Sequence, residues 1–192
     1  YLYTHKLGWT EMQGTLPVYF SVLDSTDIIK KILKLDTLTK SVSLLLNPLL
    51  KGIFSRNKSS QPPGTIRVID KFDERVDRLW QRIRKSLTYA TDRNSKYLNW
   101  RFVSNPHRYE IFALENEKNE LLGTAVTRTE EKFGYRFGYL VDIIFDPAQE
   151  AAGIALINHA IDFLKTQGCA MVTALGTDPS LKRAFKESGL RR

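Results

Sequence analysis

The sequence predicts an α/β (α+β) fold over residues 64–192, with a mixed sheet and helices on both of its faces. Hydrophobic residues make up 42% of the chain and charged residues 26%, which is typical of a globular protein with a core. Runs rich in Val, Ile and Phe alternate with segments whose apolar residues recur at helical spacing. Their order is β-α-α-β-β-β-α-β-α. Three consecutive strands followed by a strand-helix-strand crossover favour a sheet with antiparallel and parallel pairs.

The elements after Gly64 follow from apolar periodicity bounded by turn residues. Gly134 marks a turn between two strands, and Gly189 suits the end of the last helix. We expect strands at 65–70, 109–114, 121–129, 135–145 and 170–175, and helices near 72–86, 95–102, 153–167 and 181–188.

Residues 1–63 have a different character. Residues 14–23 predict a strand, in which Leu16, Val18, Phe20 and Val22 form the apolar set. We expect it to pair beside the strand at 170–175, in its own chain or in a neighbouring molecule as a dimer. Residues 24–63 predict a basic amphipathic helix and a Ser/Pro-rich linker. The apolar stripe of that helix is expected to pack on the domain, with a partner helix or an anionic membrane surface as alternatives.

Charge and cysteine content narrow the class of partner. The formal net charge is +8, and residues 1–63 hold 8 basic against 4 acidic residues, so the two parts carry +4 each. Residues 64–192 are thus nearly balanced for their size, which predicts no nucleic-acid groove in that part of the chain. Cys169 is the single cysteine, which favours a reducing, cytoplasmic location, and no Cys/His cluster has metal-ligand spacing. The longest leucine run, 44–46, is far too short for a membrane span.

The most informative stretch is an apolar strand that runs into a helix through a loop of small residues. The strand ends near Phe145, and Gly153 lies at the expected start of the helix. Unpaired N–H groups and the positive end of the helix dipole make such a start suitable for an anion, and small side chains let a pyrophosphate approach the backbone.

At these residues the chain resembles the GNAT family of acyl-CoA N-acyltransferases, whose loop of pattern Gln/Arg-x-x-Gly-x-Gly/Ala holds the pyrophosphate of acetyl-CoA. Gly153 and Ala155 match the pattern, but Glu150 stands at its first position unless Gln149 serves instead. The resemblance implies that acetyl-CoA or another acyl-CoA binds at Ile143, Ile144, Phe145, Gln149, Glu150, Ala151, Ala152, Gly153, Ile154 and Ala155. The stretch 97–106 is similar to GNAT proteins linked to surface polysaccharide biosynthesis.

The resemblance also implies catalytic and substrate residues. Asp142 occupies the place of the family's catalytic base, and its alternative role is a structural carboxylate bonded to a backbone N–H or an arginine. Phe185 stands where the family commonly has a tyrosine that protonates the leaving thiolate. Trp100, Arg101 and His107 are the candidate acceptor contacts, with core packing, an ion pair and a solvated turn as their respective alternatives.

Two functions remain open at this point. One is acyl transfer from an acyl-CoA to a small-molecule amine, with an amino sugar among the expected acceptors. The other is a non-catalytic GNAT-fold module that binds or supports a partner. The family's domain continues into two further strands beyond the last helix, so we interpret 64–192 as a truncated unit and 1–23 as the C-terminal remnant of a preceding copy in a tandem protein.

Overall fold

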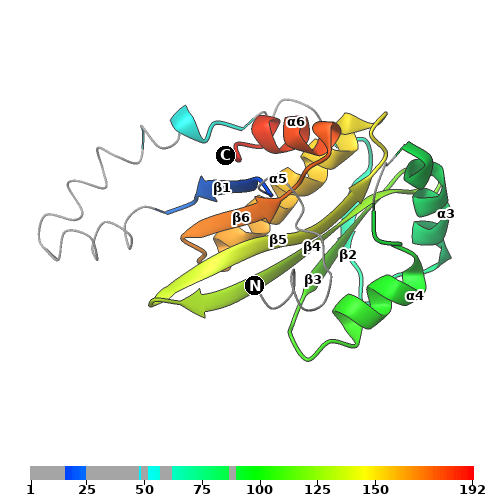
Figure 1. Ribbon diagram of the computed structural model, residues 1–192, viewed down its shortest axis with the longest axis horizontal. Coiled ribbons are helices and arrows are strands. Elements are labelled where there is room, and N and C mark those ends of the chain that lie inside the picture. Colours follow the sequence, from blue (N-terminus) through cyan, green and yellow to red (C-terminus); the bar gives the residue numbers. More distant parts are fainter. Residues whose placement is uncertain (1–15, 25–47, 49–51, 57–61, 87–89) are drawn as a thin grey trace, which may run out of the picture.

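The computed structural model describes residues 16–24, 48, 52–56, 62–86 and 90–192, whose strands form one six-stranded sheet in the order β1-β6-β5-β4-β3-β2 (Figure 1). Neighbouring strands are antiparallel, except that β5 and β6 are parallel. The strands are β1 Val18–Val22, β2 Thr65–Val68, β3 Glu110–Glu115, β4 Leu121–Lys132, β5 Tyr135–Phe145 and β6 Met171–Leu175. The helices are α3 Glu74–Ile83, α4 Ser95–Leu98, α5 Glu150–Thr166 and α6 Pro179–Glu187, with a 3₁₀ turn at Arg84–Ser86 and a π-helical turn at Asn99–Val103.

Helices cover both faces of this sheet, as the sequence predicts. On one face α5 and α6 bury an apolar cluster that includes Leu156, Leu164 and Phe185. On the other face α3 and the segment from α4 to Val103 bury a second cluster around Leu79 and Val126. Figure 1 shows the β4–β5 hairpin reaching well past α3 and α4. The order β-α-α-β-β-β-α-β-α from β2 onward is therefore confirmed.

The strand predicted at 14–23 is confirmed within its own chain. β1 pairs antiparallel with β6, from Val18 opposite Leu175 to Val22 opposite Met171. The predicted apolar set is wrong about which side is buried, because Tyr19 and Ser21 face the core while Val18 is 51% exposed. Tyr19 lies on the buried side, where its ring packs on that of Phe185 at a centroid distance of 5.0 Å. The amphipathic helix predicted within 24–63 falls mostly outside the described residues.

A bulge in β5 opens the sheet at one end. On β4, Val126 and Thr127 lie opposite Asp142 and Leu140, so Val141 is an extra residue on β5. Such an insertion bends its strand. The parallel ladder between β5 and β6 stops at Leu140 opposite Ala174. The last residues of β5 therefore separate from the chain that follows β6.

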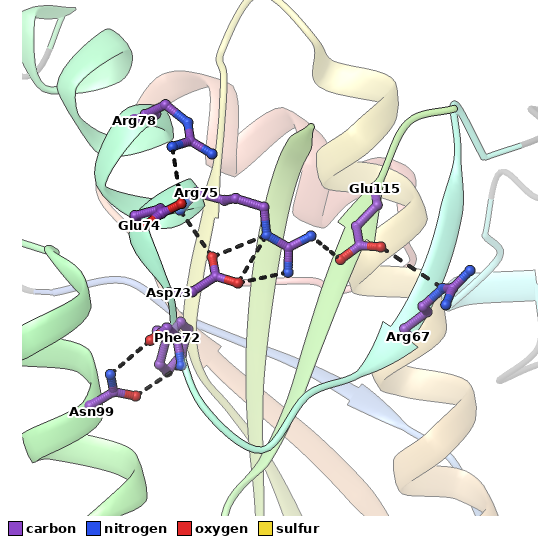
Figure 2. Close-up of polar contacts among 8 residues, drawn as sticks. All are labelled: Arg67, Phe72, Asp73, Glu74, Arg75, Arg78, Asn99 and Glu115. Carbon is purple, nitrogen blue, oxygen red and sulfur yellow. Dashed lines mark hydrogen bonds and ion pairs between the residues drawn. The ribbon is translucent and has the colours of Figure 1, made fainter. Parts of the chain in front are cut away.

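A polar cluster fixes α3 against the sheet and the π-helical turn (Figure 2). Asp73 caps α3 by accepting from the Arg75 backbone N–H at 2.9 Å. The Arg75 side chain reaches Glu115 of β3 at 2.6 Å, and Glu115 is buried. Asn99 binds the Phe72 backbone twice, accepting from its N–H and donating to its carbonyl, both at 2.8 Å. These contacts hold α3 and the π-helical turn at Asn99–Val103 in place.

We expect Asn99→Ala to destabilise the protein by about 1–3 kcal/mol, because it leaves two partly buried backbone groups of Phe72 without their partner. Urea unfolding followed by circular dichroism measures this loss. Asn105→Ala is the matched control, since Asn105 makes one bond to the backbone of an exposed turn at His107. Equal losses in the two variants would contradict a clamping role for Asn99.

Candidate active site

A cavity of about 780 Å³ lies where β5 and β6 separate, and we call it the β5–β6 cavity. Its walls come from the end of β5, from the chain after β6 and from α3. Apolar side chains from all three regions line it, together with the backbone of Gly176. Its lining residues include Trp80, Arg93, Ile143, Ile144, Phe145, Leu175, Gly176 and Thr177. The structure thus places three of the predicted cofactor residues, Ile143 to Phe145, on one wall.

The start of α5 is built differently from the predicted anion loop. α5 begins at Glu150, and no side chain caps it at Gln149. The Glu150 carboxylate pairs with Arg183 of α6 at 3.3 Å, so an arginine offsets the charge that departs from the family pattern. Pro147 lines the β5–β6 cavity, but none of residues 149–155 does. Their contact with an acyl-CoA stays a prediction.

Gly153 lies in the first turn of α5, after a strand that ends at Phe145, as predicted. A Cβ atom at this position would lie 2.6 Å from Cζ of Phe145, far inside van der Waals contact. Gly153 therefore lets the helix pack closely on a ring that also lines the cavity.

Gly153→Ala is expected to lower the free energy of unfolding, because overpacking costs about 1–3 kcal/mol and exceeds the gain of up to about 1 kcal/mol from helix propensity. Thermal unfolding of the variant measures the difference. Gly52→Ala is the control, since a Cβ there meets no atom within 4 Å. A Gly153→Ala variant as stable as the control would show that Phe145 can move aside.

Asp142 is buried on β5 and carries an ion pair. Nε of Arg93 donates to both carboxylate oxygens, at 3.1 and 3.2 Å, and the Ile143 N–H donates to Oδ1 at 2.9 Å. Burial raises the pKa of Asp142 above its ordinary value, while the cations of Arg93 and Arg101 oppose that rise. The carboxylate is thus both desolvated and partnered, so base and structural roles are each compatible with the geometry.

Sequence reasoning missed Arg93. Its guanidinium lies 5.8 Å from the Trp80 ring centroid, and Nε1 of Trp80 donates to the neighbouring Asp92. Arg93 also lines the β5–β6 cavity. Its partner Asp142 is 49 residues away in sequence, and no local pattern links the two.

A second cavity, of about 470 Å³, lies along the β4–β5 hairpin, and we call it the hairpin cavity. It is lined by Val18, Arg101, Tyr109, Arg128, Glu130, Lys132, Tyr139, Leu140, Val141, Thr173, Ala174 and Leu175. Leu175 lines both cavities. Asp142 sits between Val141, which lines the hairpin cavity, and Ile143, which lines the β5–β6 cavity. The two cavities therefore share a wall at Leu175, and Asp142 lines neither of them although its two chain neighbours line one each.

The structure brings only one of the three predicted acceptor residues to a cavity. Arg101 lines the hairpin cavity, and its Nη1 donates to the Tyr97 hydroxyl at 2.9 Å. Trp100 is 68% exposed, with its ring 5.8 Å from that of Tyr97. His107 lies in an exposed turn whose backbone N–H bonds to Asn105. Trp100 and His107 line neither cavity.

The remaining observations concern Phe185, Cys169, metal binding and membrane spans. Phe185 lies fully buried and does not line either cavity. Cys169 is a buried free thiol, and burial raises its pKa to about 11. Among the described residues no cluster of His, Cys, Asp and Glu has a metal-binding arrangement. No helix in that same part of the chain is long and apolar enough to cross a membrane.

Comparisons with known proteins add a family and a fold. The family model described as "Acetyltransferase (GNAT) family" matches residues 74–186. No curated protein matches the sequence. A solved Agrobacterium tumefaciens structure, assigned as an acetyltransferase, is 17% identical with a TM-score of 0.51, and the match covers 67% of this chain and 93% of that one.

A second solved structure matches over more of this chain. Saccharomyces cerevisiae N-myristoyltransferase with bound myristoyl-CoA is 11% identical with a TM-score of 0.59. The match covers 91% of this chain and 44% of that one, so this chain corresponds to less than half of that protein. At such identities the likeness shows a common fold.

Proposed function

The chain belongs to the acetyltransferase (GNAT) family, and from that premise we propose that it transfers an acyl group from an acyl-CoA to a small-molecule amine. The acyl-CoA would enter the β5–β6 cavity, and the amine would enter the hairpin cavity. Acetyl is the proposed group, and amino sugars are among the proposed acceptors. A cytoplasmic location fits the single buried thiol of Cys169.

The observation that carries this proposal is that the two cavities share Leu175, and that Val141 and Ile143, on either side of Asp142, line one cavity each. A group held in one cavity and an amine held in the other would approach each other beside Leu175, which lines both. Residues Ile143 to Phe145 continue β5 beyond the end of its ladder with β6. The backbone there is therefore available to an extended ligand such as the amide-rich arm of coenzyme A.

Asp142 would take the proton that the amine must lose. As the amine nitrogen bonds to the thioester carbonyl carbon, that nitrogen releases a proton to the carboxylate, and the C–S bond breaks to give a thiolate that is then protonated. A buried carboxylate with a raised pKa is a stronger base than an ordinary aspartate. Arg93 and the Ile143 N–H would orient the carboxylate.

We also propose that residues 1–23 are the C-terminal remnant of a preceding GNAT-like copy. β1 completes the sheet beside β6, which fits a 1–23 segment derived from a preceding GNAT-like copy. In this interpretation β1 belongs structurally to the sheet of 64–192 rather than to a separate unit.

A non-catalytic binding module is the second candidate. Its support is the phenylalanine at position 185, buried in the core, and the carboxylate of Glu150 at the first position of the family's phosphate loop. A module of this kind would use the fold without turning over an acyl-CoA.

Isothermal titration with acetyl-CoA, together with an assay for released thiol, tests the proposal. We expect binding in the micromolar range, and at least a tenfold loss (about 1.4 kcal/mol) in Thr177→Trp, which fills the β5–β6 cavity from its wall. Thr166→Trp, on an exposed end of α5 outside that cavity, should bind as the wild type does. Binding without thiol release in the presence of amines, or no binding at millimolar acetyl-CoA, would refute the enzyme and favour the module.

A further inference from the structure

The hairpin cavity carries an excess of positive charge. Arg101, Arg128 and Lys132 line it, against the single carboxylate of Glu130. Glu130 is already engaged by two of them, with Arg128 at 3.8 Å and Lys132 at 3.1 Å. Within the described part of the chain no carboxylate forms an ion pair with Arg101. Arg101 is therefore a cation on this wall that no described carboxylate binds directly, although its charge acts on Asp142 at longer range.

Arg101 is also held in a fixed position. Nη1 donates to the Tyr97 hydroxyl at 2.9 Å, and the guanidinium lies 5.1 Å from the Phe102 ring centroid and 6.0 Å from that of Tyr97. An arginine has five N–H donors arranged as a planar fork, which matches the oxygens of a carboxylate or a phosphate. Holding the side chain by ring contacts reduces the entropy lost when such an oxyanion binds.

A carboxylate also lies close to the hairpin cavity, without lining it. Asp142 lies next to Val141 of the cavity wall, and the field of Arg101 acts on its carboxylate. Tyr109 and Tyr139 supply ring surfaces on the same wall. A cavity of about 470 Å³ falls within the usual range of small-molecule sites.

We propose that the amine acceptor carries an oxyanion group, a carboxylate or a phosphate, which Arg101 binds with help from Arg128 while the amine faces Asp142. This inference rests on the proposed acyl transfer, and it narrows the acceptor to a small molecule with one cationic and one anionic end. A neutral amino sugar would offer Arg101 no oxyanion, and an acceptor with two amines would place a cation against it.

The inference is tested by measuring the affinity of the protein, without acyl-CoA, for two pairs of amines that differ in an anionic group. Glucosamine 6-phosphate is compared with glucosamine, and phenylalanine with phenylalaninamide, by titration followed in NMR spectra. We expect the anionic member of at least one pair to bind about 10- to 100-fold more tightly, as charge-assisted hydrogen bonds imply. The pair that discriminates identifies phosphate or carboxylate as the recognised group.

Substitutions of the cavity's arginines test whether the preference for the anionic amine arises in the hairpin cavity. Arg101→Gln should abolish it, and Arg128→Gln should reduce it. Arg136→Gln is the control, because Arg136 lies on β5 outside both cavities and pairs with Glu131 at 2.8 Å. Equal affinities within both pairs, no saturation by either anionic amine, or a preference that survives Arg101→Gln would each overturn the inference.

The same samples separate this inference from the proposed function. Titration with acetyl-CoA and the thiol-release assay report on acyl transfer alone. Acetyl transfer to glucosamine and phenylalaninamide as efficient as transfer to their anionic partners would refute the inference and retain the function. Anion-selective binding without acetyl-CoA binding would refute the function and retain the selectivity of the cavity.

Discussion

Asp142→Asn is expected to lower kcat/KM for acyl transfer by about 10²- to 10⁴-fold, the usual loss when a general base is removed. The amide keeps the shape of the side chain and cannot accept the amine's proton. Released thiol measured with saturating acetyl-CoA gives the comparison. Glu131→Gln is the control, because that carboxylate is exposed and pairs only with Arg136 among the contacts described above. Unchanged turnover in Asp142→Asn would make Asp142 a structural residue.

The pH profile gives the same prediction a second readout. A base works only when it is deprotonated, so kcat/KM falls as the pH drops through the pKa of Asp142. Because burial raises that pKa, the fall should lie at higher pH than for an ordinary aspartate. Arg93 opposes the rise, so Arg93→Met should move the fall to still higher pH. Asp142→Asn should remove it, whereas a purely structural ion pair would leave the profile in place.

Phe185→Ala is expected to cost about 3–5 kcal/mol of stability, the usual range for deleting a fully buried aromatic ring. The ring packs on Tyr19 of β1, and it also lies where a Cβ at Gly176 would be only 2.8 Å from Cε2. For a chain of this length the loss corresponds to a fall in Tm of roughly 10 °C. Phe133→Ala, at a position that is 79% exposed, should change Tm by far less.

Phe185→Tyr addresses the role of this position in chemistry. The added hydroxyl enters a fully buried site, so we expect a loss of about 1–3 kcal/mol if it finds no partner. Turnover should not rise, because Phe185 does not line the β5–β6 cavity. A higher kcat in Phe185→Tyr would show that a hydroxyl here reaches the leaving thiolate, and would mark the natural protein as impaired at this step.

The fold could be predicted because its signals are local. Apolar runs and the turn at Gly134 identify β5 at 135–145, which the structure reproduces. α5 begins at Glu150, three residues before the predicted 153, because the turn after Asp146 already supplies the helical entry. The second predicted helix, 95–102, divides into α4 and a π-helical turn, since Asn99 binds the Phe72 backbone in the middle of it.

The site could be predicted only in part because it depends on distant pairings. The stretch ending at Phe145 points to the strand that lines the β5–β6 cavity. The cavity itself arises where the β5–β6 ladder ends, which no single segment encodes. Arg93 reaches Asp142 of β5 from the chain just before α4, and Trp100 and His107 lie exposed although they are near Arg101 in sequence. The sequence therefore identifies residues of suitable chemistry, such as Asp142 and Arg101, but does not show which side chains lie close together in the fold.

The position of β1 sets an order on folding. β1 pairs with β6 along one edge, and on its other edge Phe20 exchanges two backbone hydrogen bonds with Arg191, each 2.8 Å long. Its partners on both edges therefore come from the far end of the described chain. Contacts so distant in sequence form slowly, because a long loop must close before they contribute. We expect β1 to dock last, so that a folding intermediate leaves the edge strand β6 without its backbone hydrogen-bond partner. When the protein refolds at high concentration, β6 should then pair with β1 of a second molecule.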